Sequence, residues 1–173
     1  MRSHLERIER KWAMASGGRP SLRKAAPLAL DEGALHEIRI EDWRARASAV
    51  SFALALAGPR GGAIVLVQLA HEARTDGALF ARGLEGLGVA PGRLVAAFAQ
   101  DEKRFFWALE EAAREKGLAA VIALAPRGEK LLDLTATRRL ALAAEGAAAA
   151  PIIIRTMTVA APTGVGRDAG VAA

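Results

Sequence analysis

Two short apolar runs joined by one helix constrain this chain more than any other feature. Residues Leu118 to Ala125 read LAAVIALA, residues Pro151 to Arg155 read PIIIR, and a basic helical segment starts near Leu134 between them. Strands that are apolar throughout are typical of a parallel sheet, because helices cover both of its faces. The sequence therefore predicts a βαβ unit at the centre of a parallel sheet.

The rest of the chain repeats this alternation of strand and helix. Further strands are predicted at residues 35–40, 63–68 and 93–99, and helices at residues 42–57, 71–87, 101–117 and 134–145. The second of these helices is expected to be interrupted near Gly77, and the third to be capped by Asp101 and to end at Gly117. Five strands alternating with four helices predict an α/β fold with right-handed crossovers.

The helix predicted at residues 42–57 shows a clear apolar stripe. The residues that recur at helical spacing, and that we expect to face the sheet, are Trp43, Ala47, Val50, Leu54 and Ala57. Phe52 and Leu56 make the second half of this helix apolar on nearly all sides, so this half is expected to be enclosed by other elements.

Size and composition narrow the function classes. The 173 residues, 52% of them apolar, suffice for one domain with a core. A net charge of +5 and a pI near 10.4 favour a nucleic-acid or acidic-protein partner without choosing between them. The chain has no cysteine and only three scattered histidines, so no disulfide or metal site is expected. No secretory signal or uninterrupted apolar span is present, so we expect a cytoplasmic protein without membrane contact.

Three regions are predicted: a helix and tether at residues 1–32, the α/β domain at residues 33–156, and a flexible small-residue tail at residues 157–173. Ser3 and Glu6 have the spacing of a capping box. The helix that follows carries one apolar stripe, formed by Leu5, Ile8 and Trp12, which would either dock on a partner or fold back on the sheet. The tether is basic and could contact nucleic acid through Arg19, Arg23 and Lys24.

Six segments carry a resemblance to a known family. In chain order they read GALHEI, AIVLVQLAHEA, FARGLEGLGVAPGRLV, LEEAAREKGLAAVIALA, LTATRRLALAAE and PIIIR. This ordered set resembles RecA-type recombinase cores, and in particular the ImuA family of damage-induced, RecA-like accessory proteins. The resemblance covers residues 33–155 and implies a RecA-like core.

The phosphate-binding loop of such cores is missing from this sequence. A phosphate loop needs glycines so that backbone amides can turn onto the phosphates, followed by Lys and by Ser or Thr. At the matching place, after the first strand, residues 39–48 read RIEDWRARAS without a glycine. Glu41 and Asp42 would repel phosphate there, and Arg46, near the expected lysine position, is interpreted as residual or solvated.

The other catalytic positions implied by the resemblance are also empty. Ala70 stands where a glutamate would activate water, and Leu124 or Ala125 where an acid would hold magnesium. Arg155 and Thr156 stand where an amide side chain would sense the γ-phosphate. Because phosphoryl transfer depends on metal and positioned charge, we expect no hydrolysis, no cofactor and no catalytic residue.

Two pairs of neighbouring His and Glu residues do not form a catalytic site of another kind. His71 and Glu72 suggest a proton-transfer pair at a strand end but lack a second catalytic group. His36 and Glu37 lie on opposite faces of a strand and cannot act on one atom.

The resemblance implies an adaptor in SOS-induced translesion synthesis. Its partners would be an ImuB-like, polymerase-related protein, a DnaE-type polymerase and RecA. The chain also stops after the fifth strand, where recombinase cores continue with DNA-binding segments, so strand exchange is not expected and only weak or indirect DNA contact remains open.

Candidate partner-binding residues follow from exposed aromatic and basic side chains, and two other functions stay open. The candidates are Leu5, Ile8, Trp12, Trp107, Arg138 and Arg139, although Trp107 also fits the rim of the core, and the two arginines also fit a solvated helix face. The first alternative is a SulA-like cell-division inhibitor that binds the tubulin-like division protein. The second is a nucleotide-binding enzyme with an atypical phosphate loop.

Overall fold

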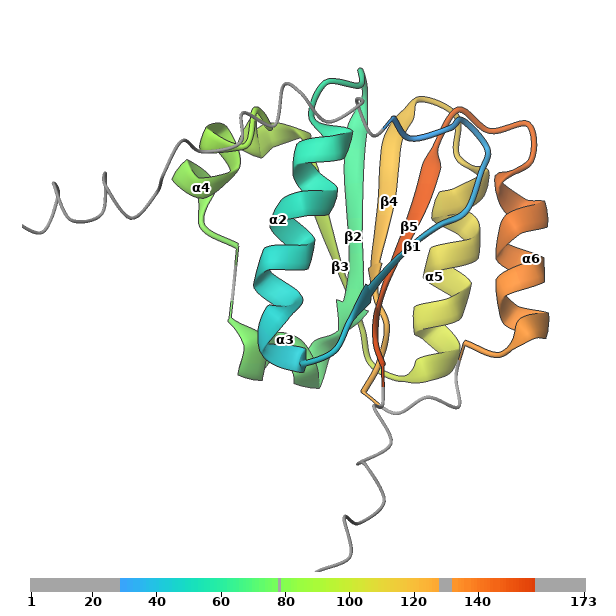
Figure 1. Ribbon diagram of the computed structural model, residues 1–173. Coiled ribbons are helices and arrows are strands. Elements are labelled where there is room, and N and C mark those ends of the chain that lie inside the picture. The colour runs from blue at the N-terminus through green and yellow to red at the C-terminus, as the bar shows by residue number, and fades with distance from the viewer. Residues whose placement is uncertain (1–28, 78, 128–131, 158–173) are drawn as a thin grey trace, which may run out of the picture.

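Five parallel strands form a single sheet at the centre of the molecule (Figure 1). The computed structural model describes residues 29–77, 79–127 and 132–157. The strands are β1 (His36–Ile40), β2 (Ala63–Leu69), β3 (Leu94–Ala99), β4 (Leu118–Leu124) and β5 (Ala150–Thr156). Their order across the sheet is β1-β5-β4-β2-β3, and every neighbouring pair is parallel. The chain is therefore an α/β protein, as its strand and helix pattern predicts.

The strand LAAVIAL lies in the middle of this sheet, as expected. β4 pairs with β5 on one side and with β2 on the other, so Ile122 lies beside both Ile152 and Leu66. Six of its seven residues are buried. A strand covered on both faces cannot alternate polar and apolar residues, which is why this run is apolar throughout.

Helices connect the strands in the predicted order. They are the short 3₁₀ helix η2 (Trp43–Ala45), α2 (Arg46–Ala57), α3 (Ala70–Asp76), α4 (Ala81–Gly86), the 3₁₀ helix η3 (Pro91–Arg93), α5 (Glu102–Arg114) and α6 (Leu134–Ala144). The predicted interruption separates α3 from α4, where Gly77 takes a φ of 88° that favours glycine. Asp101 caps α5 by accepting a hydrogen bond from the Arg104 amide at 2.8 Å, as predicted.

The two faces of the sheet have separate apolar cores. On one face, α2 and α4 bury Leu54 and Leu84 against strand residues such as Ile122. On the other face, α5 and α6 bury Phe105 and Leu140. Figure 1 shows α2 on one side of the sheet and the α5–α6 pair on the other. Right-handed crossovers produce this division, because the chain runs toward β3 through α2 to α4 and then returns through α5 and α6.

Two arginines form hydrogen bonds with backbone carbonyls at the amino-terminal ends of the strands. Arg60 donates to three backbone carbonyls: Leu30 at 2.7 Å, Ala148 at 2.9 Å and Ala119 at 3.0 Å. Arg93 donates to the carbonyls of Gly58, Gly62 and Arg60. Gly62 is required here because its φ is 98° and a Cβ at this position would overlap the Gly117 carbonyl oxygen.

The buried stripe of α2 differs from the prediction. Trp43 lies in η2 and is 48% exposed, and Ala47 and Phe52 are also exposed. Val50, Leu54 and Ala57 are buried as predicted, but the stripe starts at Arg46 and also includes Ala49 and Ala53. The reason is that the chain makes one 3₁₀ turn before the α-helix begins, which rotates the apolar stripe relative to Trp43.

Several predictions fall outside the described residues. These are the amphipathic helix with Leu5, Ile8 and Trp12, the tether with Arg19, Arg23 and Lys24, and the tail after Met157. Within the described part of the chain, no helix combines the length and the apolar character needed to cross a lipid bilayer.

Candidate functional site

The carboxyl ends of β2 and β4 mark the place where this fold would hold a ligand. These strands are neighbours, but the chain leaves β2 through α3 and α4, on the α2 side, and leaves β4 toward α6, on the opposite side. In open α/β sheets, ligands bind in the crevice that opens at the carboxyl ends of two such diverging strands. Functional side chains are therefore expected at this position.

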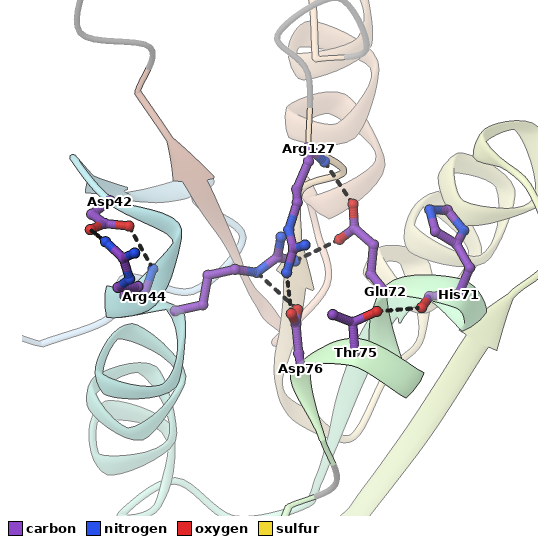
Figure 2. Close-up of polar contacts among 8 residues, drawn as sticks. Asp42, Arg44, His71, Glu72, Thr75, Asp76 and Arg127 are labelled. Carbon is purple, nitrogen blue, oxygen red and sulfur yellow. Dashed lines mark hydrogen bonds and ion pairs between the residues drawn. The ribbon is translucent and has the colours of Figure 1, made fainter.

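Four charged residues fill this position, and we call them the ionic cluster: Arg46, Glu72, Asp76 and Arg127. Arg46 begins α2, and Glu72 and Asp76 lie one turn apart on α3. Arg127 follows β4. Figure 2 shows Arg127 pointing toward Glu72 and Asp76, while His71 points away from them. The cluster thus joins three segments that are far apart in the sequence.

Arg46 is the buried centre of the ionic cluster. Its side chain is 6% exposed, with Nη2 at 3.0 Å from Glu72 Oε2 and Nε at 3.5 Å from Asp76 Oδ2. None of its three guanidinium nitrogens is aligned for a hydrogen bond with a described residue. The interaction with the two carboxylates is therefore mainly an attraction between opposite charges, which is strong in a buried environment.

Arg127 closes the ionic cluster from the outside. Its backbone amide donates to Glu72 Oε1 at 2.8 Å, and its guanidinium pairs with Asp76 Oδ1. The same guanidinium lies 5.0 Å from the centre of the Trp43 ring, which is a cation–π distance. Two arginines and two carboxylates thus balance one another, and the cluster has no net charge left to attract an anion.

This arrangement corrects the interpretation of Arg46 as residual or solvated. Arg46 lies at the start of the helix that follows β1, where phosphate-binding loops place their charge. Here its positive charge is paired with the carboxylates of Glu72 and Asp76. The adjoining cavity, lined in part by Arg46, Gln68 and Leu124, has a volume of about 130 Å³. It shares Leu66, Gln68, Gly77 and Leu79 with a neighbouring cavity of about 230 Å³. Each of the two cavities is smaller than about 300 Å³, the lower end for typical ligand pockets.

His71 and Glu72, which the sequence analysis set aside as a proton-transfer pair, do not act on a common site in the structure. His71 is exposed, whereas Glu72 is buried and paired with Arg46. Ala70 begins α3, and Ala125 donates its amide to the Ile154 carbonyl at 2.9 Å. These two positions supply no side-chain group that could hold a metal or activate water.

Arg155, at the end of β5, is also engaged within the chain. Its Nε lies 3.1 Å from Glu37 Oε1, and its Nη2 donates to the Leu132 carbonyl at 3.0 Å. Among the described residues, no group of three or more His, Cys, Asp or Glu side chains could hold a metal ion.

Sequence reasoning missed Glu72, Asp76 and Arg127 as partners of Arg46. One signal was present: Glu72 and Asp76 are four residues apart, and this spacing places both carboxylates on one face of a helix. Nothing in the sequence indicated that Arg46 and Arg127 would face them, because these contacts depend on how distant segments pack.

Two of the predicted partner-binding residues meet at a groove between α5 and α6. Trp107 is 66% exposed, so it does not belong to the rim of the core, and it lines this groove together with Arg139. The groove has a volume of about 470 Å³. Arg139 pairs with Glu110 at 2.9 Å across the two helices, whereas Arg138 is exposed and does not line the groove.

The fold is similar to that of a solved protein. The crystal structure of SulA from Pseudomonas aeruginosa superposes with a TM-score of 0.53, covering 71% of this chain and 98% of that chain. The sequence identity is 16%, so the similarity shows a shared fold and nothing further about function.

The sequence has curated relatives that indicate its family. No protein-family model matches the chain. Two ImuA proteins, from two strains of Caulobacter vibrioides, are each 38% identical to it over 137 residues. The match covers 75% of this chain and 52% of the ImuA chain, so the chain spans about half the length of the relatives it matches. The resemblance that the sequence motifs indicate is thereby confirmed, and over this stretch the chain is a homologue of ImuA.

Proposed function

We propose that this chain is a non-catalytic, RecA-like adaptor in damage-induced translesion synthesis. The homology to ImuA supports the accessory role. The ionic cluster supports the absence of nucleotide chemistry, and it is the single observation that carries this part of the proposal. Because the charge-balanced ionic cluster fills the ligand-binding crevice, the domain would act through its outer surface.

The case against nucleotide binding rests on charge and space together. To bind a phosphate at the start of α2, Arg46 would have to leave two carboxylates. Glu72 would then face the phosphate without a charged partner, and Asp76 would keep only Arg127. Burying such charges without a partner costs several kcal/mol, roughly 3–5 for a broken buried pair. Competition from the protein's own carboxylates therefore opposes the binding of an anionic ligand.

The proposed partners are an ImuB-like, polymerase-related protein, a DnaE-type polymerase and RecA, in the cytoplasm. Within the described residues, the groove between α5 and α6 is the candidate contact surface, because an exposed tryptophan beside a groove is a common anchor in protein interfaces. The apolar stripe of Leu5, Ile8 and Trp12 is a second candidate, and the basic residues Arg19, Arg23 and Lys24 would supply any weak contact with DNA.

Calorimetry with ATP and magnesium tests the non-catalytic part of the proposal. We expect no heat of binding at millimolar nucleotide and no rise in melting temperature, since a ligand that binds only the folded state would stabilise it. The variant Glu72→Gln provides a sharper comparison, because it removes one competing negative charge while keeping an acceptor for the Arg127 amide. Saturable ATP binding by the unmodified protein would contradict the proposal.

Co-purification from DNA-damaged cells tests the adaptor role and separates it from the SulA-like alternative. We expect an ImuB-like protein and a DnaE-type polymerase to be retained. Retention of the tubulin-like division protein in their place would favour a division inhibitor. The variant Trp107→Ala should lower retention, whereas Leu142→Ala, which removes a 55% exposed side chain elsewhere on α6, should not.

Deletion of residues 1–20 tests the role of the apolar stripe. If the stripe docks on a partner, the shortened protein keeps its melting temperature and loses partner binding. A large fall in melting temperature would show instead that the stripe packs on its own domain, since it would then bury apolar surface within the folded chain.

A further inference from the structure

The two lateral edges of the sheet differ sharply in composition. The β1 edge carries His36, Glu37 and Arg39, and Glu37 pairs with both Arg39 and Arg155 at 3.1 Å. The β3 edge reads LVAAFA and contains no charged residue, no polar residue and no proline. Natural proteins usually protect an edge strand with charge or proline, because free backbone N–H and C=O groups otherwise pair with another chain.

The β3 edge is both exposed and apolar. Val95 and Phe98 are each 53% exposed, and Ala96 is exposed as well. No second described strand pairs with β3 on its outer side. Beside it, a cavity of about 230 Å³ is lined by Leu94, Ala96 and Phe98 together with Leu79, which is 41% exposed. Strands of parallel sheets are normally covered, so this combination marks an interaction surface.

We propose that β3 is a self-association strand, which pairs antiparallel with β3 of a second copy of this chain. The pairing would join two five-stranded sheets into one continuous sheet across a two-fold axis. Each copy would present the same surface to the other, which is the usual geometry of a homodimer. This inference is independent of the proposed adaptor role.

A second copy fits this edge better than a charged partner does, because the strand is complementary to itself. Leu94, Ala96 and Phe98 share the sheet face that carries α2, whereas Ala97 packs into the core on the opposite face, to which Val95 also points. A two-fold axis perpendicular to the sheet keeps these faces matched between the two copies. Self-pairing therefore brings apolar side chains together and places no like charges opposite each other.

The register of the pairing is chosen by which side chains it brings together. Opposite residues must lie on the same face, so the two-fold axis passes through a residue. An axis at Ala96 places Ala96 opposite Ala96, Val95 opposite Ala97 and the two largest side chains of one face, Leu94 and Phe98, opposite each other. This register covers the exposed Phe98 ring with an aliphatic side chain. It also covers Val95 on the other face.

Cysteine cross-linking tests the pairing and its register directly. The chain contains no cysteine, so a single Ala96→Cys substitution in the full chain introduces one thiol at the expected axis. Opposite Cα atoms in an antiparallel pair are about 4.5–5.5 Å apart, which suits a disulfide. We expect mild oxidation to give a disulfide-linked dimer. Leu142→Cys, at an exposed site on α6, should form no disulfide-linked dimer under the same conditions.

Light scattering coupled to size exclusion tests association without a cross-link. At about 0.1 mM, a concentration that populates even moderately weak dimers, we expect a mass of twice 18.1 kDa for the unmodified protein. Val95→Lys should restore the monomer, because a charged side chain on an edge strand opposes pairing. The control Leu142→Lys, which changes a residue of similar exposure, should stay dimeric.

Three results would overturn the inference. The first is an unmodified protein that is monomeric at this concentration. If the β3 amides of that monomer were protected from hydrogen exchange, another part of the same chain would be covering the edge. The second is a dimer that persists in Val95→Lys. The third is a dimer in which Ala96→Cys forms no cross-link, since the two copies would then meet elsewhere.

Discussion

Arginines close both ends of the sheet, but they bind different acceptors at each end. At the amino-terminal ends of the strands, Arg60 and Arg93 donate to neutral backbone carbonyls. At the carboxyl ends, Arg46 and Arg127 face the carboxylates of Glu72 and Asp76. The first end is held by hydrogen bonds to the backbone. The second is held by a balance of charges, of which Arg46 and Glu72 are buried.

This difference separates an end that is held through backbone acceptors from an end that is held through charged side chains. The carbonyl acceptors belong to the backbone, which every sequence with this fold has. Through them, Arg60 and Arg93 hold neighbouring loops together. The carboxylates of the ionic cluster are side chains, and they occupy the end at which open α/β sheets hold their ligands. A neutral, internally paired cluster keeps that end folded without a ligand. The four predictions below test this contrast, in order of decreasing effect.

Removing one carboxylate from the ionic cluster should have the largest effect. Glu72→Ala leaves Arg46 with only one carboxylate and leaves the Arg127 amide without its acceptor. Breaking a buried ion pair in this way costs about 3–5 kcal/mol of unfolding free energy. Denaturant unfolding would measure the loss. The control is Glu111→Ala, which removes an exposed pair with Arg114 and should cost about 0–1 kcal/mol.

Loss of the clamp at the other end should be smaller. Arg60→Met keeps most of the side chain's apolar stem but removes three hydrogen bonds to carbonyls. At about 0.5–1.5 kcal/mol for each bond, we expect a loss of roughly 2–4 kcal/mol. The same unfolding experiment measures it. A loss well above that of Glu72→Ala would show that the amino-terminal end, and not the ionic cluster, dominates the stability of the sheet.

Neutralising a whole ion pair should cost less than breaking it. The double variant Arg46→Met with Glu72→Gln removes one charge of each sign, keeps an acceptor for the Arg127 amide, and leaves Asp76 paired with Arg127. Replacing a buried pair by neutral groups is often close to neutral, so we expect a loss of about 1 kcal/mol. Strong non-additivity relative to the single variants would be the signature in a double-mutant cycle.

The smallest effect should come from an exposed helix cap. The hydrogen bond from the Arg104 amide lowers the pKa of Asp101 below its ordinary value of 3.8. A lowered pKa in the folded state means that this cap contributes stability above pH 3.8 and loses it as the pH falls through the lowered pKa. In Asp101→Asn, the small difference in melting temperature from the unmodified protein should therefore shrink below pH 3.8. A difference that stays constant with pH would exclude the charge of Asp101 as its source.

Local features of the fold were predictable because their causes lie within a few residues. The apolar run at Leu118 to Leu124 marks a strand covered on both faces, and it forms the central strand. Gly77 and Asp101 mark a helix break and a helix start through their own backbone and side-chain chemistry. The absence of a glycine-rich loop in residues 39–48 likewise needs no structure to be recognised.

The rotation of α2 was not predictable in the same way. Both Trp43 and Arg46 are compatible with a helical stripe on the sheet side, and apolar character favoured Trp43. The 3₁₀ turn at Trp43–Ala45 instead places Arg46 inside and leaves Trp43 as a cover over Arg127. Burial of a charge is favourable only when opposite charges are already in place, and these come from α3.

The sequence by itself determined that this chain is an α/β protein, that it resembles ImuA over residues 33–155, and that it lacks the motifs for nucleotide hydrolysis. The tertiary structure decided what fills the empty site, because Arg46, Glu72, Asp76 and Arg127 meet only when the diverging strands β2 and β4 lie side by side. The same holds for β3, whose apolar sequence reads as a core strand until the strand order places it at an edge. Periodicity and local chemistry act over a few residues, whereas ion pairing and edge exposure depend on contacts between distant parts of the chain.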